Sequence, residues 1–116
     1  MKIVIQGSKT FNDYNVFMRA IMVAMSPLIE EDDHADIYSV GPSKLNHLAT
    51  GFVNITEDSM KARGLSLRMH RVPPNWVKDH IKEFDYFAYL SHPNEPVSWL
   101  AKTAEDSGVE LGIFRY

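Results

Sequence analysis

The sequence contains no cysteine among its 116 residues. This absence excludes disulfide bonds, thiolate catalysis and cysteine-based zinc sites. The chain also has no excess of basic residues, because 12 lysines and arginines stand against 15 aspartates and glutamates, for a net charge of −3. Proteins that bind nucleic acid through its phosphates usually carry a basic surface. We therefore expect no nucleic-acid partner.

Long apolar runs are missing as well. No stretch approaches the roughly 20 apolar residues of a membrane-spanning helix, and the first apolar run, 2–6, is too short for the core of a signal peptide. We therefore expect a cytoplasmic protein that does not associate with membranes. The hydrophobic fraction of 45% and charged fraction of 23% are ordinary for a globular chain. At this length they indicate a single domain over residues 1–116.

Strand-like and helix-like patterns alternate along the chain. Runs of β-branched, aromatic or alternating apolar residues predict strands over 2–6, 35–40, 65–72, 85–91 and 109–114. Amphipathic segments predict helices over 12–25, 44–63, 75–84 and 97–107. Asn12 or Asp13 is expected to cap the first helix and Pro27 to stop it, and Ser43 is expected to cap the second helix. The second helix is expected to bend or break near Gly51 or Asn54 and to end at Gly64, and Trp99 is expected to face inward.

Strict alternation of strands and helices predicts an α/β fold. The expected architecture is a single three-layer Rossmann-like domain, with a five-stranded parallel sheet in the order 3-2-1-4-5 and helices on both faces. Ligands of such sheets bind at the carboxyl ends of the strands, where the strand order reverses. Here the reversal lies between the first and fourth strands. It would bring together three polar loops, at 7–11, 41–44 and 91–96.

The first of these loops carries the strongest ligand-binding signal. Gly7, Ser8, Lys9 and Thr10 follow the first strand directly and lead into a helix. Glycine permits a close backbone approach, and amide groups at the start of a helix favour an anion. Lys9 would act as a point charge on a phosphate group. We therefore expect these four residues to bind a ligand.

The other two loops add further candidates. We expect ligand contacts from Gly41, Ser43, Lys44, Asn46, His92 and Asn94. Some have a simpler interpretation, because Ser43 would also serve as a helix cap and Lys44 as a surface charge. Glu95 and His47 are weak candidates for acid–base catalysis. No metal site is expected, since the histidines lack metal-binding spacing and the acidic run 30–33 suits a solvated loop.

The loop sequences resemble one protein family. Gly7-Ser8-Lys9-Thr10-Phe11 resembles the Gly-Ser-Arg-x-Phe start of small SLOG-superfamily proteins (the YspA-like group), which are related to LOG-type and DprA-like domains. Ser39, Gly41 and, approximately, Asn46 match the family's Ser-Gly-Gly-Ala-x-Gly-Ala-Asp segment, whose other two glycines are absent here. The family's later Ser-x-Gly-Thr turn would fall near 92–98, which contains no glycine. The Pro-Gly-Gly-x-Gly-Thr-x-x-Glu motif of LOG-type enzymes is also absent, so no hydrolase activity is carried over.

The resemblance implies a protein that senses or sequesters a nucleotide or nucleotide-derived molecule, with phosphate near the glycine loops. No cofactor is expected. One alternative is a protein-interaction or inhibitor module, of viral or mobile-element origin, that kept the fold without a working pocket. Another is a hydrolase of the same fold that cleaves a nucleotide glycosidic or phosphate bond. Homo-oligomerisation is also open, through the methionine-rich first helix or an edge strand.

Overall fold

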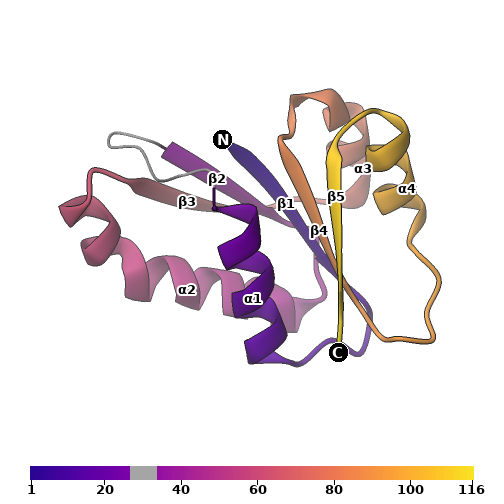
Figure 1. The fold of residues 1–116 in the computed structure, drawn as a ribbon, viewed down its shortest axis with the longest axis horizontal. Helices are drawn as coiled ribbons and strands as arrows, with labels where there is room; N and C mark the ends of the chain where they lie inside the picture. Colours follow the sequence, from indigo (N-terminus) through magenta and orange to yellow (C-terminus); the bar gives the residue numbers. More distant parts are fainter. Residues whose placement is uncertain (27–33) are drawn as a thin grey trace.

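The computed structural model describes residues 1–26 and 34–116 and contains five strands and four helices (Figure 1). The strands are β1 (Lys2–Gly7), β2 (His34–Ser39), β3 (Ser66–Arg71), β4 (Tyr86–Ser91) and β5 (Glu110–Arg115). The helices are α1 (Tyr14–Ala24), α2 (Ser43–Ala62), α3 (Pro74–Asp79) and α4 (Trp99–Asp106), with a short 3-10 turn, η1 (Ile81–Glu83). As predicted, each strand is followed by a helical segment until the last.

The five strands form one parallel sheet in the order β3-β2-β1-β4-β5, which confirms the predicted fold class. β1 pairs with β2 on one side and with β4 on the other, so the strand order reverses at β1. All six residues of β4 are buried, as the apolar sequence of this segment indicated. The partly exposed strands β3 and β5 form the two edges.

Two apolar clusters hold the helices against the sheet. Ile3 and Ile5 point to the face covered by α1 and α2, where they join Phe17 and a larger cluster. Val4 lies between them in sequence and points to the opposite face, where it packs with Phe87 among residues of α3 and α4. This alternation along a central strand buries both faces of the sheet, as in other parallel sheets with helices on both sides.

Four local expectations differ from the structure. α2 is one continuous helix through Gly51 and Asn54, so it is not broken there, and its N-cap is Pro42, so Ser43 is the first helical residue and not the cap. The helix expected over 75–84 ends at Asp79 and gives way to η1. Trp99 is 52% exposed, because it is the first residue of α4 and points outward there. The cap of α1 is Asp13, one of the two residues expected, and its carboxylate accepts a bond from the Val16 amide.

Two further expectations fall on residues outside the described ones: the solvated acidic loop over 30–33, and a stop of the first helix at Pro27. In the part of the chain that the structure describes, no helix has the length and apolar character needed to cross a membrane.

Candidate functional site

Three buried serines mark the carboxyl ends of β1, β2 and β4. Ser8, Ser39 and Ser91 are at most 4% exposed. A hydroxyl removed from water costs free energy unless it is hydrogen-bonded, and each of these serines has a side-chain partner. The partners are Tyr116, Asn46 and Arg115. We call the loops after β1, β2 and β4, together with residues 115–116 at the end of β5, the carboxyl edge.

Ser8 is bonded to Tyr116. The Tyr116 hydroxyl contacts Ser8 Oγ and lies 3.1 Å from Thr10 Oγ1. Its ring packs edge-on against Phe11, with ring centroids 5.3 Å apart, and against His92, with centroids 5.9 Å apart. The last residue of the sequence therefore lies between the first and third loops, at the point where the strand order reverses.

Ser39 fixes the start of α2. Its hydroxyl donates to Oδ1 of Asn46, in the first turn of that helix, while the Asn46 amide donates to the Pro42 carbonyl at 3.1 Å. Gly41 precedes the helix with a φ of +109°, in the region that favours glycine. Asn46, expected to bind ligand, thus connects the helix to the strand through its side chain.

Ser91 receives a hydrogen bond from Arg115. Nη1 of Arg115 lies 2.7 Å from Ser91 Oγ, 3.0 Å from the His92 carbonyl and 3.1 Å from the Glu95 carbonyl. Bonds from a charged donor are stronger than neutral ones. Arg115 therefore holds the start of the third loop against the end of β5.

The opposite end of that loop is fixed by Ser98. Its hydroxyl donates to Gln6 Oε1 at 2.6 Å and accepts from the Ala101 amide at 3.1 Å, which makes Ser98 the N-cap of α4. The third loop is therefore anchored to β5 at one end and to β1 at the other.

The glycine of the first loop has a packing role. The Gly7 amide donates to the Gly41 carbonyl at 3.0 Å, and the Ser8 amide donates to the Leu90 carbonyl at 2.9 Å. A Cβ on Gly7 would lie 3.1 Å from Phe11 Cβ and 3.2 Å from Pro42 Cδ. These two amides join the neighbouring strands and loops, so neither of them is free to bind an anion.

Several of the predicted residues face solvent at this edge: Lys9, Thr10, Ser43, Lys44, His47, His92 and Asn94. Ser8 is buried, and four other predicted residues are partly buried: Gly7, Gly41, Asn46 and Glu95. The structure thus divides the predicted site into a buried frame and an exposed rim. The rim contains the cationic and imidazole side chains that would meet a ligand.

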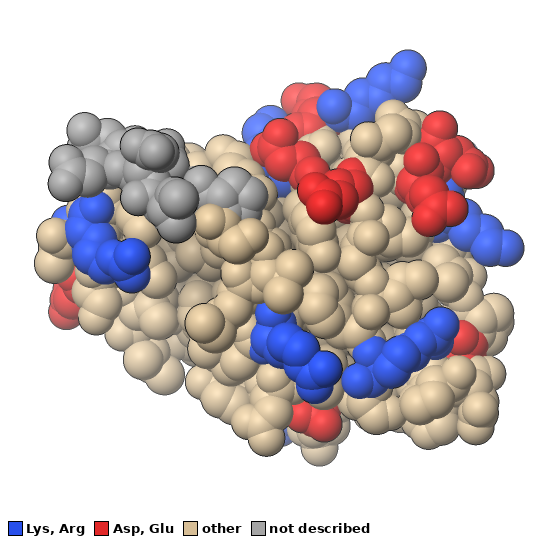
Figure 2. Space-filling model, in the orientation of Figure 1, with Lys and Arg blue, Asp and Glu red and all other residues tan. Residues whose placement is uncertain are grey.

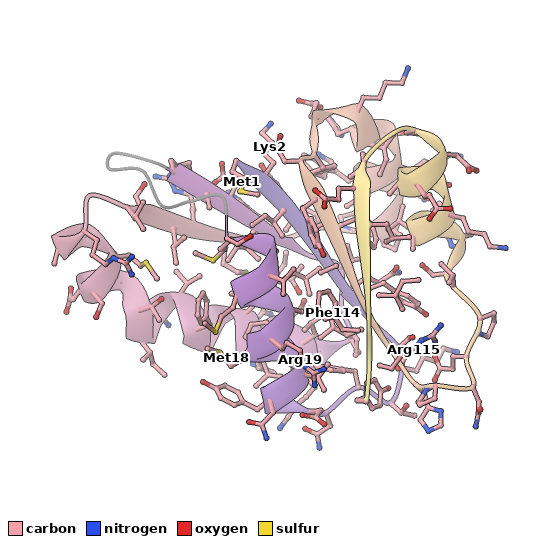
Figure 3. The ribbon with its side chains drawn as sticks, viewed as in Figure 1. Met1, Lys2, Met18, Arg19, Phe114 and Arg115 are labelled. Carbon is pink, nitrogen blue, oxygen red and sulfur yellow. The ribbon has the colours of Figure 1, made fainter. Side chains whose placement is uncertain are left out.

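Basic residues gather at the ends of the strands. A lysine or arginine lies at or just after the end of four of them: Lys9, Lys44, Arg71 and Arg115. Figure 2 shows most of the acidic side chains of this face at its upper end, over the start of β4 and β5 and with basic side chains among them, and two basic side chains lower down with acidic ones nearby. Figure 3 places two of the basic ones, Arg19 and Arg115, on either side of the lower part of β5. The carboxyl edge is therefore more basic than a chain of net charge −3 would suggest.

The weak catalytic candidates share no hydrogen bond with each other among the described residues. His47 lies in the first turns of α2, and Glu95 lies in the third loop with its carbonyl bonded to Arg115. The pKa of Tyr89 is raised above its ordinary value, chiefly by burial and then by the negative charge of Glu95. No group of three or more His, Asp or Glu side chains in residues 1–26 and 34–116 could hold a metal ion.

Sequence reasoning missed Arg115, Tyr116 and Ser91. Arg115 and Tyr116 could have been found from the sequence. Ligands meet the carboxyl ends of parallel strands, and this rule applies to the fifth strand as well. That strand was expected to end at residue 114, one residue short of its end. Ser91 was placed where the fourth strand meets the third loop but was not singled out as a site residue, because its arginine partner lies 24 positions away in the sequence.

No protein-family model, curated protein or solved structure matches this chain significantly.

Proposed function

We propose that this protein binds a small anionic molecule, a nucleotide or nucleotide derivative, at the carboxyl edge between β1 and β4. One observation carries the proposal: exposed Thr10 and His92 contact Tyr116 where the strand order reverses, and exposed Lys9 directly precedes Thr10 in the first loop. Lys44 adds a second lysine from the start of α2. Ligands of open parallel sheets occupy this position.

The proposed ligand is held by side chains. Lys9 and Lys44 supply the positive charge for a phosphate, in place of the backbone cradle of a glycine-rich loop. Tyr116 and His92 supply two aromatic rings at the same edge, and an aromatic ring can stack with a nucleobase. The combination of cationic and aromatic groups favours a nucleotide over a simple inorganic anion.

A thermal-shift screen against nucleotides, cyclic nucleotides and ADP-ribose derivatives tests the proposal. A ligand at a hundred times its dissociation constant stabilises the folded state by about 2.7 kcal/mol. Lys9→Ala and Lys44→Ala should each reduce this shift. Lys82→Ala is the matched control, because Lys82 is an exposed lysine in η1, which leads into the start of β4, at the opposite end of that strand. The assigned site is wrong if a ligand raises the melting temperature of all three variants as much as that of the wild type.

A second candidate function is a protein-interaction module without a small-molecule site. The Tyr116 hydroxyl bonded to Ser8 and Thr10 favours it, because this side chain occupies the position where a ligand would sit. Under this alternative the ligand screen is flat, and a tagged wild-type protein captures a specific partner that the Lys9→Ala variant also captures. A ligand shift lost in Lys9→Ala would contradict it.

A further inference from the structure

A second site lies between α1 and α2, toward the opposite edge of the sheet. It is an apolar cavity of about 340 Å³, within the range of about 300–1,000 Å³ typical of small-molecule sites. Its lining consists of Met18, Ile21, Met22, Met25 and Ser26 from α1 and the residues that follow it, Phe52, Thr56, Met60 and Arg63 from α2, and Leu65. Figure 3 shows Met18 on the side of α1 that faces α2.

The helical repeat explains how the sequence builds this cavity. Phe52, Thr56, Met60 and Arg63 recur every three or four residues and so share one stripe of α2. The stripe of α1 that faces it follows the same spacing. Gly64, with a φ of +76°, then turns the chain back.

The turn at Gly64 places Leu65 in the wall of the cavity. The Leu65 amide donates to the Met60 carbonyl at 2.8 Å, and the Gly64 amide donates to the Lys61 carbonyl at 3.0 Å. The pattern is that of a Schellman cap, in which the residue after the glycine packs against the last helical turn. Leu65 is accordingly buried and lines the cavity.

The lining offers one charge and few free polar groups. Its two hydroxyls bond to their own segments: Ser26 Oγ donates to the Val23 carbonyl at 2.8 Å, and Thr56 Oγ1 donates to the Phe52 carbonyl at 2.6 Å. Arg63, at the end of α2, is the one charged residue among those that line the cavity. Four flexible methionines make up the rest of the wall together with aliphatic and aromatic groups, and methionine side chains adapt to unbranched apolar ligands.

We propose that this cavity binds an amphipathic monoanion, with an unbranched acyl chain among the methionines and a carboxylate at Arg63. The volume suits one chain of medium length, and the single guanidinium suits a single anionic head group. The site is distinct from the one at the carboxyl edge, because none of its lining residues belongs to that edge and Leu65 directly precedes the start of β3.

The six methionines give a direct test by NMR of methyl-labelled protein. Decanoate, used below its micelle concentration, should shift the methyl signals of the four lining methionines, Met18, Met22, Met25 and Met60. The signals of Met1 and Met69 should stay in place, since neither lines the cavity. Calorimetry with hexanoate, octanoate and decanoate should show about fourfold tighter binding per added methylene (about 0.8 kcal/mol), until the cavity is full.

Charge recognition is tested with Arg63→Gln. This variant should bind decanoate about fivefold more weakly (about 1 kcal/mol) and decanol as the wild type does. Arg68→Gln on β3 is the matched control and should change neither affinity. The proposal is overturned if decanoate moves none of the four signals, or if Arg63→Gln leaves decanoate affinity unchanged. It is also overturned if the same signals move on dilution without ligand, alongside a change in mass by sedimentation, because a second copy of the chain would then occupy the cavity.

Discussion

At the scale of single residues, the three buried serines show how the carboxyl edge is assembled. Each hydroxyl binds a side chain from a different part of the chain: Ser8 binds Tyr116, Ser39 binds Asn46, and Ser91 binds Arg115. These contacts order the loops before any ligand arrives. An ordered site loses less conformational entropy when it binds.

Tyr116→Phe tests this frame. Removing the hydroxyl takes away the bonds to Ser8 and Thr10 and leaves the buried Ser8 hydroxyl without this partner. We expect a loss of about 1–2 kcal/mol in the free energy of unfolding, measured by urea denaturation. Tyr14→Phe is the control, because Tyr14 is 53% exposed, and it should change stability by less than about 0.5 kcal/mol. Equal effects of the two substitutions would contradict a structural role for the Tyr116 hydroxyl.

A different polar cluster lies at β2 and β3. Asp36 Oδ1 is 2.9 Å from Nε2 of His70 and 3.1 Å from Nε2 of His34. Burial by itself would raise the pKa of Asp36, but hydrogen bonds from the two histidines and their charge outweigh it. The pKa of Asp36 in the folded protein therefore lies below its usual 3.8.

This shift predicts how stability depends on pH. Because the folded-state pKa is lowered, the ionised carboxylate stabilises the fold above the unfolded-state pKa, and this stabilisation is lost as pH falls from about 4 through the folded pKa. Asp36→Asn should be less stable than the wild type at neutral pH, and the difference should narrow in acid. Asp58→Asn, at an exposed position of α2, is the control in the same denaturation series. If the free energies of unfolding of Asp36→Asn and the wild type differ by the same amount down to pH 3, the assigned role of the Asp36 carboxylate is wrong.

At the scale of elements, α2 shows where local signals failed. Gly51 and Asn54 predicted a bend or a break, and the helix runs without a break through both. Leu45, Ala49 and Phe52 are buried on one side of it, so tertiary packing against the sheet overrides the low helix propensity of a single glycine. By contrast, Gly64 was correctly predicted to end the helix, because a positive φ at that position is a backbone requirement.

Two glycine-to-alanine substitutions in and after α2 should therefore have opposite signs. Gly51→Ala should stabilise the protein by about 0.5–1 kcal/mol, since a Cβ there would meet no atom within 4 Å and alanine favours the helix. Gly64→Ala should destabilise it by about 1–2 kcal/mol, because the Cβ of alanine raises the energy of a backbone with positive φ. Thermal or urea unfolding of both variants measures this. Effects of the same sign would contradict the assigned backbone roles.

At the scale of the whole molecule, the parallel sheet was predictable because it follows from the strict alternation of strands and helices, and the order 3-2-1-4-5 is one of the common orders of such sheets. The rim of the candidate site was predictable for the same reason, since Lys9, Lys44 and His92 all follow parallel strands. The closing of the edge by Tyr116 was not, because its bond to Ser8 joins residues 108 positions apart. No local pattern specifies such a contact. The sequence predicted that three polar loops meet at this edge, and the structure adds the side-chain contacts that join them.

The most direct test of the proposed function is an amide chemical-shift map, recorded while the best nucleotide from the screen is added to the protein. We expect the largest shifts at Lys9, Thr10, Lys44 and His92, with little change along the second half of α2. Shifts confined to the α1–α2 cavity, or spread evenly over the chain, would contradict a ligand site at the carboxyl edge.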